Sequence, residues 1–194
     1  ISLCQWVVAQ PRDEVARKRS RYVDLDPGWG WTRKGIATLL NTALRNAPRS
    51  LPIGLRDDVW RVLEVLSEDP HPTPEDEQRH GGDMMDAYEF SVNATRSEAM
   101  DAIIAYTIWA QDGSVSGKSA TTRTLGTVPE ARRVLERHLD VEIDPSRAVR
   151  AIYGRWFGNL YHADPTWAAE QIERIFPNGP ESRPLWDAAW ESFL

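Results

Sequence analysis

Apolar residues recur at intervals of three and four along most of this chain, which is the spacing of one face of an α-helix. The pattern predicts helices over seven stretches, which are residues 31–46, 55–69, 97–110, 128–140, 146–164, 166–176 and 183–194. No stretch shows a convincing alternation of apolar and polar residues, the mark of a half-buried β-strand. Residues 1–194 are therefore expected to form one all-α domain, an irregular array of about seven or eight antiparallel helices.

The starts of several predicted helices share a local signal. Asp-Pro pairs occur at residues 26–27, 144–145 and 164–165. In each pair the aspartate can accept hydrogen bonds from the first turn, where proline is also favoured. The starts near Asp144, Asp164 and Ser182 are 20 and 18 residues apart. A two-helix unit of about 40 residues is typical of HEAT and armadillo repeats, so we expect a HEAT/armadillo-like α–α superhelix.

The stretch 97–110 is unusual because it is apolar over most of its length. Asn93 or Thr95 can cap the helix that it predicts, and Glu98 can reach back to complete a capping box. The run from Met100 to Trp109 is apolar enough for a helix that is covered by other elements. We therefore expect this helix to lie at the centre of the domain.

The segment GSVSGKS, Gly113–Ser119, has part of the pattern of a phosphate-binding loop. That motif needs four residues between its first glycine and the closing Gly-Lys-Ser/Thr. Only three residues separate Gly113 from Gly117, and the residues that follow lead to Pro129 without a helix start. We therefore expect residues 111–127 to form a loop that binds no nucleotide.

A second predicted loop, residues 68–83, is rich in proline, glycine and charge and contains a candidate metal site. Its possible ligands are His71, Glu75, His80 and Asp83. No pair of histidines lies one helical turn apart to fix the geometry of a metal ion. A solvated acidic loop is the simpler interpretation, and the alternative is a small helical metal-dependent enzyme that uses the His71–Asp83 loop.

No other residues form a catalytic pattern in the sequence. His138 lies beside the apolar face of its predicted helix, and His162 lies near a helix end, where an imidazolium suits the helix dipole. Neither histidine has an acid, cysteine or serine partner that the sequence identifies. We therefore expect no catalytic, cofactor-binding or metal-binding residue and no enzymatic activity in this segment.

Composition narrows the class of partner. The 194 residues carry a formal net charge of −6, which gives no general attraction to nucleic acid or to anionic lipid. One basic cluster, Arg17–Arg21, makes a module that contacts nucleic acid a second alternative. No apolar run reaches the roughly 20 residues of a membrane span. The single cysteine, Cys4, favours a reducing cytoplasm.

Both ends of the sequence are apolar. The predicted last helix has an apolar stripe wide enough to contact two neighbours, formed by Leu185, Trp186, Ala189, Trp190 and Phe193. The first residues form another apolar run, which contains Leu3, Cys4, Trp6, Val7 and Val8. Because a helical array needs polar capping units at its ends, we expect a fragment of a longer helical chain that can self-associate through these ends.

Two segments carry a resemblance to known proteins. SVNATRSEAMDAIIAYTIWA (91–110) and DPTWAAEQIERIFP…LWDAAWESFL (164–194) resemble the helical-repeat region of very large, poorly characterised bacterial multidomain proteins. Those proteins are similar in build to defence-type NTPases, and their chemistry resides in other domains. The resemblance implies a non-catalytic scaffold, sensor or protein-interaction segment, whose partners are neighbouring domains of the parent chain or other proteins.

Overall fold

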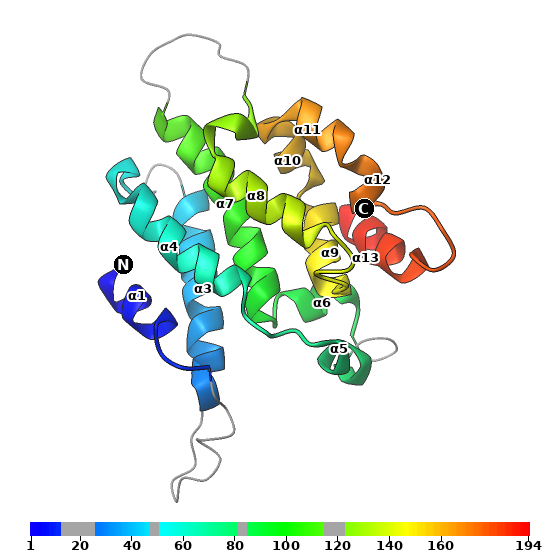
Figure 1. Ribbon diagram of the computed structural model, residues 1–194, viewed down its shortest axis with the longest axis horizontal. Helices are drawn as coiled ribbons and strands as arrows, with labels where there is room; N and C mark the ends of the chain where they lie inside the picture. Colours follow the sequence, from blue (N-terminus) through cyan, green and yellow to red (C-terminus); the bar gives the residue numbers. More distant parts are fainter. Residues whose placement is uncertain (13–25, 47–50, 81–84, 115–122) are drawn as a thin grey trace, which may run out of the picture.

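The computed structural model describes residues 1–12, 26–46, 51–80, 85–114 and 123–194. Within these ranges the chain forms twelve α-helices and three short 3₁₀ helices, and it contains no β-strand (Figure 1). The all-α prediction is therefore confirmed. The basic cluster Arg17–Arg21, the candidate ligand Asp83 and the Gly117–Ser119 part of the glycine-rich motif lie outside the described residues.

The helices follow one another in a simple order along the chain. The first half contains α1 (Ser2–Val8), η1 (Pro27–Trp29), α3 (Gly30–Arg45), η2 (Ile53–Leu55), α4 (Arg56–Ser67), α5 (Pro74–His80), α6 (Ala87–Ser91) and α7 (Thr95–Ser114). The second half contains η3 (Leu125–Thr127), α8 (Pro129–His138), α9 (Arg147–Arg155), α10 (Phe157–Ala163), α11 (Pro165–Glu170), α12 (Ile172–Ile175) and α13 (Arg183–Phe193).

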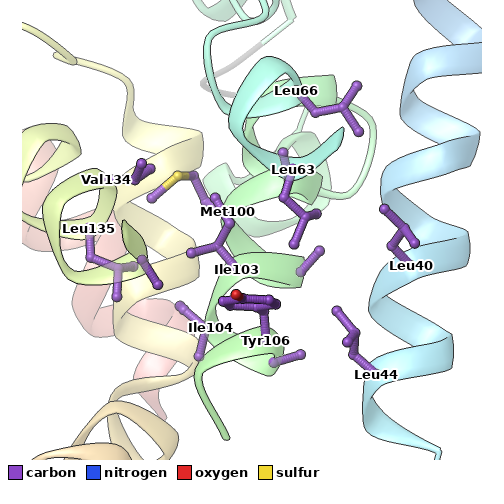
Figure 2. Packing of buried hydrophobic residues seen from close by; sticks show 14 of the residues in the cluster. Leu40, Leu44, Leu63, Leu66, Met100, Ile103, Ile104, Tyr106, Val134 and Leu135 are labelled. Atoms are coloured by element: carbon purple, nitrogen blue, oxygen red, sulfur yellow. The ribbon is translucent and has the colours of Figure 1, made fainter. Parts of the chain in front are cut away.

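Helix α7 lies at the centre, as the sequence predicts. Its Met100, Ile103, Ile104 and Tyr106 are completely buried. Figure 2 shows these side chains between leucines of α3 and α4 on one side and Val134 and Leu135 of α8 on the other. Burial of each large apolar side chain contributes roughly 1.5–3 kcal/mol. The helix that is apolar on most sides is thus the one that its neighbours surround.

The arrangement around α7 does not confirm the HEAT/armadillo-like superhelix. In such a superhelix each repeat contacts only its neighbours in the stack. Here α7 packs against α3, α4, α8, α9 and α10 (Figure 1). The second half of the chain is thus tied to the first through α7, and α6 also packs against α9 and α13.

The described helices outnumber the seven or eight expected because two predicted helices are interrupted and because α1, α5 and α6 lie outside the predicted stretches. The predicted helix 146–164 is divided into α9 and α10 at Trp156, whose φ of −104° and ψ of 18° lie outside the helical range. The predicted helix 166–176 is divided into α11 and α12 at Gln171, where φ is −94° and ψ is 1°. Each break turns the chain while the apolar spacing continues across it.

The Asp-Pro signal marks one helix start directly. Asp164 caps α11 by accepting a hydrogen bond from the backbone N–H of Trp167 at 3.0 Å. The Asp26 carboxylate accepts hydrogen bonds from the backbone N–H groups of Trp31 and Thr32, in the first turn of α3. At the third pair the prediction is wrong, because Ser146 caps α9. Asp144 is free for a different role, described below.

The two predicted loops are partly helical. The segment 68–83 contains α5, and α7 extends through Gly113 to Ser114. The connection from α7 to η3 is fastened at both sides. The Gln111 amide donates to the carbonyls of Thr124 and Ala163, each at 3.0 Å, and Arg123 forms an ion pair with Asp112 at 2.6 Å.

Candidate functional site

A buried polar network surrounds Asp144 at the connection between α8 and α9. Its Oδ2 lies 2.7 Å from Nδ1 of His138 and accepts a hydrogen bond from Nε of Arg96 at 3.1 Å. Arg96 also donates to the backbone carbonyls of Asp69 and Pro72, both at 2.8 Å. The network therefore joins the start of α7 to the segment after α4 and to the α8–α9 connection.

The charges around Asp144 change its titration. Burial alone would raise the pKa of its carboxyl group, but the hydrogen bond with His138 and the charge of Arg96 outweigh that effect. The net result is a pKa below the ordinary value of 3.8. Asp144 is thus an ionised carboxylate at neutral pH, held by the side chains of His138 and Arg96 and by the backbone N–H of Ser146.

The pairing of His138 with Asp144 corrects the sequence analysis, which finds no acid partner for this histidine. An Asp–His pair can orient a general base, but His138 is only 3% exposed. Its Nε2 is buried without a hydrogen bond and lies 3.8 Å from a carboxylate oxygen of Glu68. The His138 imidazole therefore faces the protein interior and Glu68. Such a buried His138–Asp144 pair suits a structural role.

Of the four candidate metal ligands, the structure describes the side chains of His71 and Glu75. The imidazole Nδ1 of His71 accepts a hydrogen bond from the backbone N–H of Thr95 at 3.4 Å. Glu75 is exposed on α5, and nothing is described for the His80 side chain or for Asp83. Across the described ranges, no group of three or more His, Cys, Asp or Glu side chains is placed to hold a metal ion.

A cavity of about 570 Å³ lies beside the polar network, and three of its charged side chains, Glu77, Arg96 and Arg147, take part in ion pairs or hydrogen bonds. It is lined in part by Glu77 and Arg96. The Glu77 carboxylate accepts hydrogen bonds from the Ser146 hydroxyl and from the backbone N–H groups of Arg147 and Ala148 at the start of α9. Glu77 therefore holds the N-terminus of α9 in place. Arg96 is occupied in the same way by its contacts with Asp144.

A second cavity, of about 970 Å³, opens at the C-terminal side of the molecule and is mainly aromatic. We call it the aromatic pocket. Its wall contains Phe157 of α10, Phe176 after α12, and Trp186, Trp190 and Phe193 of α13. Glu173 of α12 and Arg183 of α13 are charged residues of the same wall. The pocket thus lies between α10, α12 and α13, which are labelled in Figure 1.

The rings of the aromatic pocket pack against one another. The Phe176 ring lies 5.6 Å from Phe157, 6.1 Å from Trp190 and 5.9 Å from Phe193, in edge-to-face geometry. Trp186 and Trp190 are stacked, with ring centroids 5.3 Å apart and an interplanar angle of 16°. Such contacts stabilise aromatic pairs beyond their buried area. The wall is therefore a connected set of rings held in defined orientations.

Part of this aromatic wall faces solvent. Trp190 is 38% exposed and Phe193 is 46% exposed, and Ile172 of the same wall is 46% exposed. Large apolar side chains that gather in an open cavity mark binding sites more often than isolated exposed ones do. The aromatic pocket is therefore the candidate functional site.

The sequence predicts part of this site, because the apolar stripe of the last helix is wide enough to contact two neighbours. The structure buries Leu185 and Ala189 of that stripe and places Trp186, Trp190 and Phe193 in the pocket wall. Phe157 and Phe176 were missed as members, because they come from helices that the sequence cannot place beside α13.

Comparison with protein-family models, curated proteins and solved structures finds no match to this chain. The resemblance of residues 91–110 and 164–194 to large bacterial multidomain proteins therefore stays an expectation. In the described ranges, no helix combines the length and the apolar character that a membrane crossing requires. The candidate site rests on its own geometry and chemistry.

Proposed function

We propose that this chain is a non-catalytic helical scaffold, sensor or protein-interaction segment of a larger bacterial protein. Its partner is another protein or a neighbouring domain of the same parent chain. The observation that carries the proposal is the aromatic pocket, in which exposed Trp190 and Phe193 line an open cavity of about 970 Å³. Tryptophan and phenylalanine are enriched where proteins contact one another.

The energetics of the pocket favour a macromolecular partner. An aromatic side chain buries 150–250 Å² when it is covered. Each Å² of apolar surface removed from water contributes about 25 cal/mol of favourable free energy. The α13 backbone that carries Trp186, Trp190 and Phe193 is held by the packing of α13 on α9. A partner that covers these rings would therefore gain apolar burial without first ordering the surface.

The polar groups of the molecule favour a non-catalytic role. His138 and Asp144 are buried in an ion-pair network, and the network joins structural elements. In the aromatic pocket the charged wall residues are Glu173 and Arg183, and Arg183 is paired with Asp187 at 2.7 Å. Such a wall offers binding contacts, whereas a general acid–base pair or a nucleophile with its base would be needed for most catalysis.

The alternatives have less support. A metal-dependent enzyme would need the His71–Asp83 segment to gather its ligands, and among the described residues no group of three possible ligands is placed to hold a metal ion. A nucleic-acid module would depend on the basic cluster Arg17–Arg21. The formal net charge of −6 on the whole chain opposes binding to a negatively charged phosphate backbone. Self-association through the apolar ends would cover Leu3 and Trp6 at one end or the aromatic pocket at the other. The single cysteine, Cys4, suits a cytoplasmic location.

The proposal can be tested by peptide display on the immobilised chain. We expect wild-type protein to enrich peptides with a shared motif, and Trp190→Ala to lose their binding. Trp31→Ala is the matched control, because Trp31 lies on α3 and is 73% exposed. Circular dichroism would check that both variants stay helical. Enriched peptides that bind all three proteins equally, or no enrichment at all, would contradict the proposed function.

A further inference from the structure

We infer that the aromatic pocket binds a basic peptide segment and seats an arginine or lysine side chain on its rings. The inference rests on the proposed function, because it names the chemistry of the partner at the same site. The aromatic wall supplies the surface for the cation, and Glu173 supplies the opposite charge.

The first observation is the aromatic wall itself. A cation that lies over the face of an aromatic ring is attracted by the ring quadrupole, most strongly for tryptophan. Trp190 and Phe193 present ring surface to solvent beside Phe176 and Trp186. The cavity therefore offers exposed aromatic surface to an ammonium or guanidinium group together with its aliphatic stem.

The second observation is that the chain already makes this contact at the same wall. The guanidinium carbon of Arg183 lies 4.6 Å from the ring centroid of Trp186. Its Nε donates to Asp187 at 2.7 Å. A tryptophan face with an adjacent carboxylate thus holds one guanidinium at the edge of the stacked Trp186–Trp190 pair. Trp190 and Glu173 place a tryptophan ring and a carboxylate in the wall of the same cavity.

The third observation is charge. Glu173 is exposed in the pocket wall, and its side chain has no hydrogen bond or ion pair with any described residue. Residues 164–194 contain six aspartates or glutamates and two arginines. An acidic surface attracts basic segments and repels acidic or phosphorylated ones. It also disfavours a second copy of α13, which would bring Asp187 and Glu191 against the same negative charges.

The test uses a short Gly/Ser peptide that carries arginine, and a twin in which citrulline replaces each arginine. Citrulline has nearly the same shape as arginine and no charge. We expect the citrulline peptide to bind at least about threefold more weakly by fluorescence anisotropy, as loss of a cation–π contact implies. Binding of the arginine peptide should weaken as the salt concentration rises, because exposed charges are screened.

Two variants locate the effect. Glu173→Gln should weaken the arginine peptide about two- to fivefold and leave the citrulline peptide unchanged, the range for an exposed ion pair. Glu170→Gln removes the same charge from the exposed end of α11, outside the pocket wall, and should leave both peptides unchanged. Trp190→Ala should abolish binding of both peptides. Equal losses in Glu173→Gln and Glu170→Gln would overturn the assignment of Glu173.

The possible outcomes separate this inference from the proposed function. If both peptides bind equally and both depend on Trp190, the pocket is an interaction site but the preference for a basic segment is wrong. If neither peptide binds, the inference is overturned. The proposed function would then fall only if the display experiment also yields no peptide that depends on Trp190.

Discussion

Gly154 of α9 lies directly against the backbone carbonyl of Ala189 of α13, with no room for a side chain between them. A Cβ atom at position 154 would overlap the carbonyl oxygen, and it would lie 2.7 Å from the Cα of Ala189. Because both obstacles are backbone atoms, no side-chain rotation can relieve the overlap. The close approach of α9 and α13, and with it the position of the aromatic pocket, therefore depends on a glycine.

We expect Gly154→Ala to lower the free energy of unfolding by about 1–3 kcal/mol, the range for overpacked sites. Gly35→Ala in the middle of α3 is the control, because a Cβ there would meet no atom within 4 Å. That change should stabilise the helix by up to about 1 kcal/mol. Urea unfolding of the two variants measures both values, and a Gly154→Ala protein as stable as wild type would refute the close approach.

Asp144→Ala should destabilise the protein far more than loss of a surface ion pair. It leaves the Arg96 guanidinium, whose side chain is 14% exposed, without its carboxylate. Breaking a buried pair from one side costs about 3–5 kcal/mol. The comparison is Asp187→Ala, which breaks the exposed pair with Arg183 and should cost about 0.3–0.5 kcal/mol. If the two variants lost similar amounts of unfolding free energy, the Asp144 network would contribute little to stability.

The same carboxylate should make stability depend on pH in acid. The pKa of Asp144 in the folded protein lies below its ordinary value of 3.8. Its contribution to stability is therefore fully present above the ordinary value and is lost as pH falls through the folded-state pKa. We expect the stability difference between wild type and Asp144→Asn to be largest near neutral pH and to shrink below about pH 4. A difference that stays constant with pH would contradict the assignment.

Glu98 should behave in the opposite way. Its side chain is buried, which raises the pKa, although a hydrogen bond from Thr38 at 2.8 Å partly offsets this effect. The folded state therefore disfavours the ionised form, and the resulting cost is present above the folded-state pKa and absent below the unfolded-state pKa. Glu98→Gln keeps an acceptor for Thr38, so we expect it to raise the melting temperature at pH 7. The gain should disappear as the pH is lowered, and a melting temperature below that of wild type at pH 7 would contradict it.

How far the sequence predicts the fold can be judged from particular elements. Apolar spacing locates α7 and its central position, because a helix covered on most sides must be apolar on most sides. It does not locate the break at Trp156, because the pattern records which side chains are buried and not where the axis turns. Helix α5 was predicted as a loop from its prolines and charges. Yet Pro74 in the first turn and the acidic residues after it are also signals of a helix start.

The candidate site was predictable only in part. The apolar stripe of α13 indicates a second contact surface, and the structure places that surface in the pocket wall. The Asp144–His138 pair was missed because its two residues belong to different elements, and a spacing of six residues implies no contact by itself. Phe157 and Phe176 join the pocket through tertiary packing, which the sequence pattern does not specify.

The anchoring of the connection between α7 and η3 has a practical consequence for experiments on this protein. Gln111 and the Asp112–Arg123 ion pair fix the two ends of the connection independently of the residues between them. Lengthening a loop with fixed ends costs little, about 0.6 kcal/mol for each doubling of its length. If residues 115–122 form the loop that the sequence predicts, they are a suitable place to insert an epitope or a fluorescent reporter. A reporter there would leave the α9–α13 packing and its aromatic rings untouched, so the same labelled protein could serve every binding assay proposed above.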